Sequence, residues 1–243
     1  KKVFDKYMEM TDYGKSFLLA SDIAEFKQYE LKIDDLVLSG STELYTLVSN
    51  RIMQRIKEAE QYYKDALEKP FTFTEDDEIE LDGKKLTWCA TSDELKTRWF
   101  KSMKYRTLAR YTELLEQQKN SKDEKEKAKT REQLEADARE NVKKSMVFFF
   151  KRLNKISDSD RFATYMNSIC HVVDPHTDFF PPKDKQRFDE EMSGSFYGIG
   201  AQLQSEDGAC KIKQVIVGTP SWKDGRLKVE DIIQKVAQGD DDP

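Results

Sequence analysis

Three prolines in the segment DPHTDFFPPKD divide the chain into two parts with different hydrophobic patterns. Before Pro175, apolar residues recur every three to four positions, which is typical of amphipathic helices. After Pro181 and Pro182 the period falls towards two, which is typical of strands, and proline disfavours a helix that continues through it. The pattern therefore predicts a mainly α-helical N-terminal domain over residues 1–185 and a smaller α+β domain over residues 186–243.

The composition excludes some classes of function. Charged residues make up 36% of the 243 residues and hydrophobic residues 37%, so we expect long helices with solvated faces. Acidic and basic residues are interspersed and the formal net charge is -5, which argues against a nucleic-acid-binding surface. The chain lacks the run of about eighteen apolar residues that a membrane span requires. It opens without a signal peptide or methionine, which suggests a processed or excised piece.

The cysteines indicate no metal site. Cys89, Cys170 and Cys210 are far apart, and none belongs to a CxxC motif. Cys170 adjoins His171, but neighbouring residues on a helix point to different faces, so the pair is a poor zinc site. We expect the three cysteines to be small buried apolar residues and His171 to be a packing residue, with no metal or cofactor.

Two long amphipathic helices are predicted over residues 42–70 and 91–118. Pro70 ends the first, and Thr91 with Glu94 forms a capping box at the start of the second. Their apolar residues, spaced by three or four, are Leu44, Leu47, Ile52, Ile56, Ala59, Tyr63 and Leu67 in the first and Leu95, Trp99, Met103, Leu108, Tyr111 and Leu115 in the second. Both helices should bury one face.

The remaining segments of the first domain have weaker patterns. Residues 71–89 alternate briefly and contain an Asp82, Gly83 turn, so we expect an irregular or β-like excursion. Residues 119–145 are dominated by charge, which favours a solvated helix face or a mobile loop over a docking arm. Asp158 is expected to cap a further helix that buries Phe162, Met166 and Ile169.

Two glycines one residue apart stand at the start of an alternating segment. A strand is predicted over residues 196–204, a turn at Asp207 and Gly208, and a second strand over residues 210–217. Gly198 and Gly200 give the backbone angles that let consecutive N–H groups converge on an anion such as a peptide carboxylate.

The strand that follows the glycines suggests how a peptide could bind there. Ala201, Gln202 and Leu203 could pair with the residues that precede a bound carboxylate, which is recognition by strand addition. The alternative is a β-bulge or a tight corner that binds no ligand.

Other polar residues are weaker candidates. Ser193 and Ser195 precede the glycines without a matching lysine motif, so we interpret them as ordinary residues leading into the strand rather than as nucleophiles. His176 and Thr177 could be an acid and base pair. With Asp174 they more closely match a proline-bounded turn that satisfies backbone groups.

Longer motifs resemble a known family. The stretch VIVGTPSWKDGRLKVEDII resembles the pattern that follows the glycine loop and hairpin in PDZ domains of bacterial processing proteases. Glu230 stands where that family usually has glycine, and Ser221 and Trp222 replace two small residues. The stretch DPHTDFFPPKDKQRFDEEMSGSFYGIGAQL resembles the segment that leads into the PDZ domain of the tail-specific, or carboxyl-terminal processing, protease. VFDKYMEMTDYGKSFLLASDIAEF and YYKDALEKPFTFTEDDEIELD resemble the helical N-terminal domain of that family.

The resemblance implies a serine endopeptidase of the bacterial envelope or periplasm that captures proteins by an apolar C-terminus. Its catalytic serine and lysine would lie beyond this chain, so we expect no catalytic residue here and an inactive fragment. Residues 186–243 would form a partial PDZ domain, cut before its last helix and strand. The alternative is a helical and PDZ-like adaptor without catalysis.

The resemblance also implies particular contacts. Gly198, Ile199, Gly200 and Ala201 would form the carboxylate-binding loop, and Gln202 and Leu203 would lie on the pairing strand. Ile199 and Leu203 would help to line an apolar pocket. The expected partners are C-terminal tails of substrate proteins, with an adaptor protein possible on the helical domain.

Overall fold

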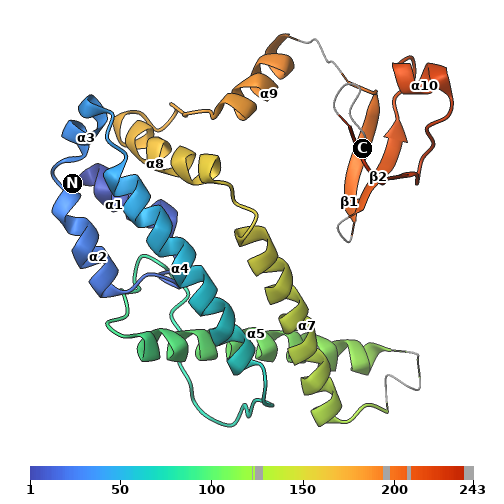
Figure 1. The fold of residues 1–243 in the computed structure, drawn as a ribbon. Helices are drawn as coiled ribbons and strands as arrows, with labels where there is room; N and C mark the ends of the chain where they lie inside the picture. The colour runs from blue at the N-terminus through green and yellow to red at the C-terminus, as the bar shows by residue number, and fades with distance from the viewer. Residues whose placement is uncertain (122, 124–127, 194–197, 207–208, 238–243) are drawn as a thin grey trace. The chain divides into compact units, whose positions relative to one another are not determined.

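The computed structural model describes residues 1–121, 123, 128–193, 198–206 and 209–237 (Figure 1). The chain divides into two compact units, Lys1–Pro181 and Pro182–Pro243. The first is helical and the second contains a small antiparallel sheet, which confirms the predicted fold class. None of the described helices has the length and apolar content needed to cross a membrane.

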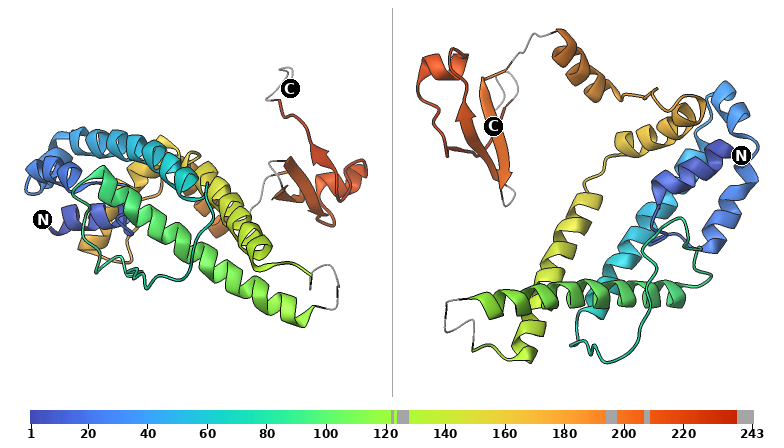
Figure 2. Two further views of the ribbon diagram at one scale, coloured as in Figure 1. Left: turned by 90° about the horizontal axis from the view of Figure 1, so that it is seen from below. Right: turned by 180° about the vertical axis from the view of Figure 1, so that it is seen from behind.

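The first unit is built from short helices followed by long ones. The short elements are α1 (Lys2–Thr11), α2 (Ala20–Phe26), the 3-10 turn η1 (Lys27–Tyr29) and α3 (Ile33–Ser39). The long helices are α4 (Glu43–Ala66), α5 (Ser92–Asn120), α7 (Arg131–Leu153) and α8 (Asp158–Val173). Helix α5 crosses α4 and α7 and packs against both, and α1 packs on α8 (Figures 1 and 2).

The two helices predicted from periodicity are confirmed as α4 and α5. The predicted face of α4 is buried, apart from Leu47, which is half-buried. On α5 the N-terminal positions of that face are buried, but Leu108 is 37% exposed, and Tyr111 and Leu115 are only half-buried. Because α5 lies across its neighbours instead of along them, only part of its apolar stripe is covered.

Capping side chains fix the starts of two long helices. Thr91 Oγ1 accepts a hydrogen bond from the Glu94 N–H (3.2 Å), but the Glu94 carboxylate accepts from Ala90 (2.8 Å) instead of Thr91. The predicted capping box is therefore formed with a shifted partner. Helix α8 is capped by Ser157, not by Asp158, because Ser157 and Asp160 make the reciprocal pair of hydrogen bonds.

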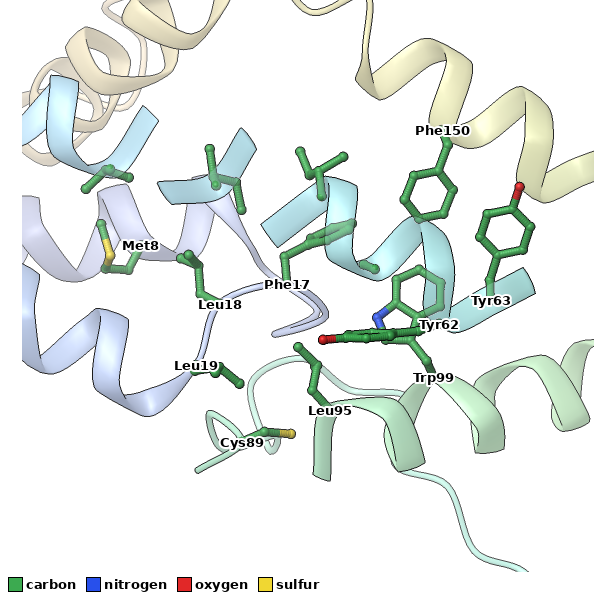
Figure 3. Close-up of a cluster of buried hydrophobic side chains, with 14 of the residues drawn as sticks. Met8, Phe17, Leu18, Leu19, Tyr62, Tyr63, Cys89, Leu95, Trp99 and Phe150 are labelled. Carbon is green, nitrogen blue, oxygen red and sulfur yellow. The ribbon is translucent and has the colours of Figure 1, made fainter. Parts of the chain in front are cut away.

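The core of the first unit draws on all its main helices. Figure 3 shows aromatic and aliphatic side chains from the α1–α2 region, α4, α5 and α7 converging. Tyr63 stacks on Phe150 with ring centroids 4.9 Å apart, and the indole N–H of Trp99 donates to the Ser16 carbonyl (2.7 Å). On α8 the buried residues are Tyr165 and Ser168, whereas the predicted Phe162, Met166 and Ile169 pack against the core while half-buried.

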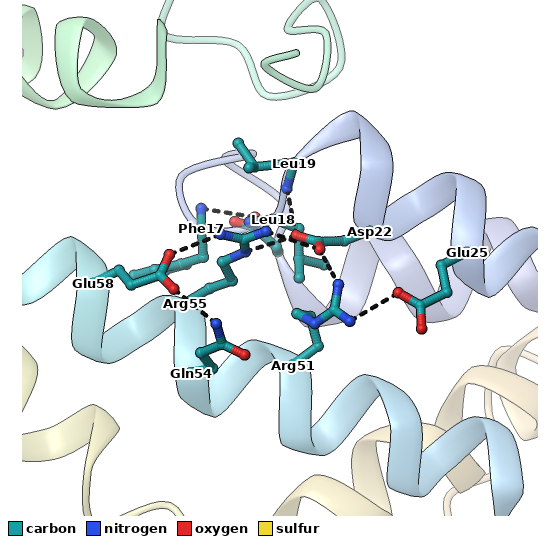
Figure 4. Close-up of polar contacts among 10 residues, drawn as sticks. Phe17, Leu18, Leu19, Asp22, Glu25, Arg51, Gln54, Arg55 and Glu58 are labelled. Atoms are coloured by element: carbon teal, nitrogen blue, oxygen red, sulfur yellow. Dashed lines mark hydrogen bonds and ion pairs between the residues drawn. The ribbon is translucent and has the colours of Figure 1, made fainter. Parts of the chain in front are cut away.

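The buried carboxylate of Asp22 is paired with two arginines. The Asp22 carboxylate is fully buried and accepts hydrogen bonds from Arg51, from Arg55 Nε (2.8 Å) and from the Leu19 N–H (2.9 Å) (Figure 4). Arg51 and Arg55 also bind Glu25 and Glu58, respectively. Burial opposes ionisation of Asp22, but these hydrogen bonds, with Arg55 contributing most, hold its pKa below the usual value. The network ties α2 to α4.

A second buried carboxylate shapes the loop between α1 and α2. Asp12 accepts hydrogen bonds from the N–H groups of Ser16, Phe17 and Leu18, each at 2.9 Å. These bonds satisfy backbone donors that burial has removed from water. Burial nonetheless raises the Asp12 pKa.

The other predicted segments of the first unit have mixed outcomes. Residues 71–89 were expected to be irregular or β-like, and they are irregular. One isolated β-bridge joins Cys89 to Leu19. Within 119–145, helix α7 buries Leu134, Ala138 and Val142, so this segment is more than a solvated face or loop; residues 122 and 124–127 lie outside the described part. All three thiols are free, but only Cys89 is buried, and Cys170 and Cys210 are half-buried, which corrects the expectation for those two.

The second unit begins with a helix that was not predicted. Helix α8 ends at Val173, so no helix continues through the prolines, as expected, but a new helix, α9 (Pro182–Ser193), starts at one of them. Proline is well tolerated in the first helical turn, because the N–H that it lacks has no partner within the helix there.

The sheet of the second unit is small and antiparallel, with the order β1 (Ala201–Glu206), β2 (Ala209–Val215), β3 (Ile232–Ile233). The short helix α10 (Pro220–Asp224) follows β2. The first strand starts at Ala201 and not within the predicted 196–200, since residues 198–200 form bends. Residues 196 and 197 and the predicted turn residues Asp207 and Gly208 lie outside the described part.

Candidate functional site

Strand β1 is an edge of the sheet, and its backbone faces can be assigned. The Ile216 N–H donates to the Gly200 carbonyl (2.8 Å), so the next residue, Ala201, turns its N–H and C=O away from β2. Leu203 lies opposite Ile212, whose own N–H and C=O are bonded to Asp231 and Glu230 on the β3 side. The backbone groups of Ala201 and Leu203 therefore point to the open edge.

Gln202 differs from its neighbours on β1. It pairs with Gln214, and the register shifts between Gln202 and Leu203, which marks a β-bulge. Alternation along the strand directs the main chain of Gln202 towards β2. Both predicted pairing residues therefore lie on β1, but only Leu203 turns its main-chain N–H and C=O to the edge. The Gln202 side chain is exposed.

The glycine corner, residues 198–200, is held by the segment after β2. Gly200 is buried and has a φ of 82°, a left-handed conformation that favours glycine. The Thr219 hydroxyl lies 3.2 Å from the Gly200 carbonyl and 2.6 Å from that of Ile216. The Ser221 N–H donates to the Ile199 carbonyl (3.1 Å). These bonds use carbonyl groups and leave the N–H side of the corner available.

The apolar side chains beside the corner are exposed, and two of its N–H groups have no acceptor among the described residues. Within the described part of the chain, no acceptor lies in hydrogen-bonding range of the Ile199 and Gly200 N–H groups. The side chains of Ile199 and Leu203 are 49% and 50% exposed. Among the described residues, the arrangement brings together N–H groups without an acceptor, a strand edge without a neighbouring strand and exposed apolar side chains.

Both departures from the PDZ-like sequence pattern fall near this sheet. Glu230 has a φ of 75°, so a non-glycine residue occupies a left-handed position where the resembling family usually has glycine. Its carboxylate contacts Lys211 Nζ at 3.4 Å. Ser221 bonds to the glycine corner, and the neighbouring Trp222 is 52% exposed.

The candidate acid and base pair belongs to a turn. Asp174 accepts hydrogen bonds from the His176 N–H (3.1 Å) and the Thr177 hydroxyl (2.8 Å), and these bonds lower the Asp174 pKa. His171 lies in the last turn of α8, and its Nε2 lies 2.7 Å from the Asp178 carboxylate. The four side chains stabilise the chain after α8, as the turn interpretation predicts.

The same segment, residues 174–181, is bonded back onto α8. The side-chain amide of Asn167 accepts from the Phe179 N–H (2.6 Å) and donates to the Phe179 carbonyl (3.3 Å), as a neighbouring strand would. The Phe179 ring packs edge-on against Phe162. We call this segment the α8 arm. No local pattern in the sequence marks Asn167 as its anchor.

The two candidate serines have different outcomes. Ser193 ends α9, and its hydroxyl donates to the Glu190 carbonyl (3.0 Å), which is a common bond at helix ends. Ser195 lies outside the described residues.

Comparisons with known proteins agree with one another. The family model described as "Tail specific protease N-terminal domain" matches residues 1–183. The tail-specific protease of Haemophilus influenzae is 26% identical over 243 residues, which is 100% of this chain and 32% of that protein. The carboxy-terminal processing protease CtpA of Bacillus subtilis is 41% identical over 68 residues, 28% of this chain and 14% of that protein. A probable CtpA-like serine protease of Staphylococcus haemolyticus is 27% identical over 113 residues, 42% of this chain and 22% of that protein.

Proposed function

The chain belongs to the tail-specific protease family, and from this premise we propose that it is the substrate-recognition part of a serine endopeptidase. The chain spans about a third of the length of the Haemophilus relative, and we place the catalytic serine and lysine outside these residues. The protein would capture other proteins by an apolar C-terminus and degrade or process them. The observation that carries the proposal is the open edge of β1 beside the glycine corner.

The proposed binding follows from the free backbone groups. The carboxylate of a protein tail accepts from N–H groups of the glycine corner, among Gly198, Ile199, Gly200 and Ala201. The preceding residues of the tail pair with the edge-facing groups of Ala201 and Leu203. Ile199 and Leu203 contact the terminal apolar side chain. This arrangement explains why a protein that selects chain ends would keep an edge strand unpaired.

The wider setting follows from the family. The relatives with known organisms are bacterial, and we propose a location in the bacterial envelope or periplasm. Proteins would be the substrates, with an adaptor protein docking on the helical unit as a further partner. A non-catalytic adaptor that only tethers C-terminal tails is the second candidate, and the same open edge supports it.

The experiment is a fluorescence-polarisation titration of the full-length protein with one apolar-ended peptide, prepared as a free acid and as an amide. Hydrogen bonds to a charged group contribute about 1.5–3 kcal/mol each, so the amide should bind at least about tenfold more weakly. Mass spectrometry of the mixture then separates the candidates: fragments support the protease, and capture without fragments supports the adaptor. Equal affinity for acid and amide would reject the glycine corner as a carboxylate site.

A matched pair of variants tests strand addition separately. Leu203→Pro removes an edge-facing N–H without removing a bond to β2, and edge strands tolerate proline at such positions. Leu203→Ala removes the same side chain but keeps the N–H. We expect the proline variant to bind the free-acid peptide about tenfold more weakly than the alanine variant; equal affinities would contradict pairing at Leu203.

A further inference from the structure

Two hollows in the helical unit join into one groove along α5 and α7. The first has a volume of about 300 Å³ and lies between these helices and the loop that follows α1. The second, of about 540 Å³, lies further along the same two helices. Arg106 and Met146 line both hollows, so the two adjoin. We call the combined feature the α5–α7 groove.

The groove offers apolar and aromatic surface. Trp99, Met146 and Phe149 line the first hollow, and Tyr105 and Phe148 line the second. Tyr105 is 43% exposed and Phe148 is 57% exposed, although both lie on helices rich in charge. Exposed aromatic side chains that flank a hollow are typical of surfaces that bind another chain.

The groove also has an excess of positive charge. Arg106 and Lys144 have no carboxylate within ion-pair range among the described residues, and both are exposed. Arg98 donates to the carbonyls of Lys15 and Thr87, and its charge also acts on the Asp12 carboxylate, so the excess rests on Arg106 and Lys144.

The acidic groups in the groove do not offset this excess. Glu113 is bound to Arg110 (2.7 Å). The Asp12 carboxylate is buried and turned towards the N–H groups of its own loop. A positive groove in a chain of net charge -5 is complementary to an acidic partner.

We propose that the α5–α7 groove binds an acidic polypeptide segment that carries an aromatic or aliphatic side chain. The apolar side chain enters the hollow beside Met146, and flanking carboxylates meet Arg106 and Lys144. Arginine suits this role because its planar guanidinium can bind a carboxylate through two hydrogen bonds. The site lies on the helical unit and is independent of the glycine corner, so it gives a protein partner a second contact.

The test uses a fluorescein-labelled peptide rich in glutamate with one central phenylalanine. Its C-terminus is amidated, so that a carboxylate site at the glycine corner makes no contribution. Anisotropy with the full-length protein should show saturable binding that weakens as salt rises from about 50 to 300 mM. The double variant Arg106→Glu, Lys144→Glu should bind roughly tenfold more weakly, and the milder Arg106→Gln, Lys144→Gln less weakly.

Two controls make the result specific. Lys57→Glu, Lys69→Glu makes the same change of charge at exposed positions away from the groove and should bind as the unaltered protein does. Leu203→Pro should also bind normally, which separates this proposal from the one for β1. Equal affinity of the groove and control variants, or equal binding of a peptide with lysine in place of glutamate, would overturn the proposal, as would the absence of binding at about 1 mM peptide.

Discussion

The side chain of Thr219 occupies the space in which a Cβ on Gly200 would lie. An ideal Cβ at residue 200 would be 2.1 Å from the Thr219 Cβ and 2.2 Å from its hydroxyl oxygen. Such distances are far below van der Waals contact, and the Gly200 φ of 82° already disfavours other residues. Gly200 and Thr219 therefore fix the glycine corner against the end of β2, whether or not a ligand is present.

Replacement of Gly200 by alanine should loosen the sheet of the second unit. The strained φ and the contact with Thr219 together should cost roughly 2–4 kcal/mol of its stability. Gly218→Ala is the matched control, because Gly218 has a similar φ of 86° but nothing within 4 Å of its added Cβ. Hydrogen exchange of β1 and β2 amides should rise more in the Gly200 variant, and equal rates would show that the Thr219 contact is unimportant. Loss of peptide capture by a Gly200 variant would accordingly not isolate a ligand contact.

Replacement of Glu230 by glycine should stabilise the same sheet. A left-handed conformation costs a non-glycine residue about 1–2 kcal/mol, which glycine would avoid. Glycine also has more conformational freedom in the unfolded chain, and this reduces the gain in stability by about 0.5–1 kcal/mol. The exposed contact with Lys211 contributes little. We expect slower hydrogen exchange in β2 for Glu230→Gly but not for Glu230→Ala, which loses the same ion pair and keeps the strain. Equal exchange in the two variants would contradict this account.

The helical unit should lose stability in acid through Asp22. The folded-state pKa of Asp22 lies below its ordinary value of 3.8, so its contribution is complete above that value and is lost as pH falls through the folded pKa. Asp22→Asn should destabilise the unit by roughly 3 kcal/mol at pH 7. Urea unfolding at a series of pH values would measure this. The difference in unfolding free energy between Asp22→Asn and the unaltered protein should narrow below about pH 4.

Asp12 is a control, because its effect on stability should depend on pH in the opposite direction to that of Asp22. Its folded pKa is raised by burial, so its protonation favours the folded state as pH falls through that pKa. The unfolding free energy of the unaltered protein should therefore rise relative to that of Asp12→Asn as pH falls. Parallel behaviour of the two asparagine variants would show that the two carboxyl groups do not differ in this way.

The α8 arm should depend on Asn167. Asn167→Leu removes both hydrogen bonds to Phe179, at about 0.5–1.5 kcal/mol each, while Asn167→Asp keeps only the acceptor for the Phe179 N–H. Chymotrypsin should then cleave after Phe179 fastest in the leucine variant and at an intermediate rate in the aspartate variant. Unchanged cleavage in both would mean that the ring contact with Phe162 alone holds the arm.

Periodicity could predict the helices that bury a continuous face. The apolar positions of α4 were identified correctly because that helix is covered along its length, whereas Leu108 on α5 was not, since the crossing of helices decides where coverage ends. Helix α9 was not predicted because proline was treated only as a residue that breaks a helix interior. Pro182 lies in the first turn of α9, where proline is tolerated.

The details of the candidate site depend on contacts between distant residues. The left-handed residue Glu230 stands at a departure from the family pattern, so the sequence contained a signal for it. The contact of Gly200 with Thr219 had none, because it depends on the register of β1 and β2 and the bulge at Gln202. The pairing of Asp22 with Arg51 and Arg55 likewise links separate helices, and no local spacing reveals it.

The open edge of β1 has a cost for the protein in concentrated solution. The groups that Ala201 and Leu203 turn outwards would pair as readily with β1 of a second copy as with the proposed protein tail, because main-chain hydrogen bonds do not distinguish the two. The exposed Leu203 side chain adds apolar contact to such a pair. Self-association through β1 would compete with the proposed tail binding. An excess of protein tails would therefore dissociate dimers that form through β1.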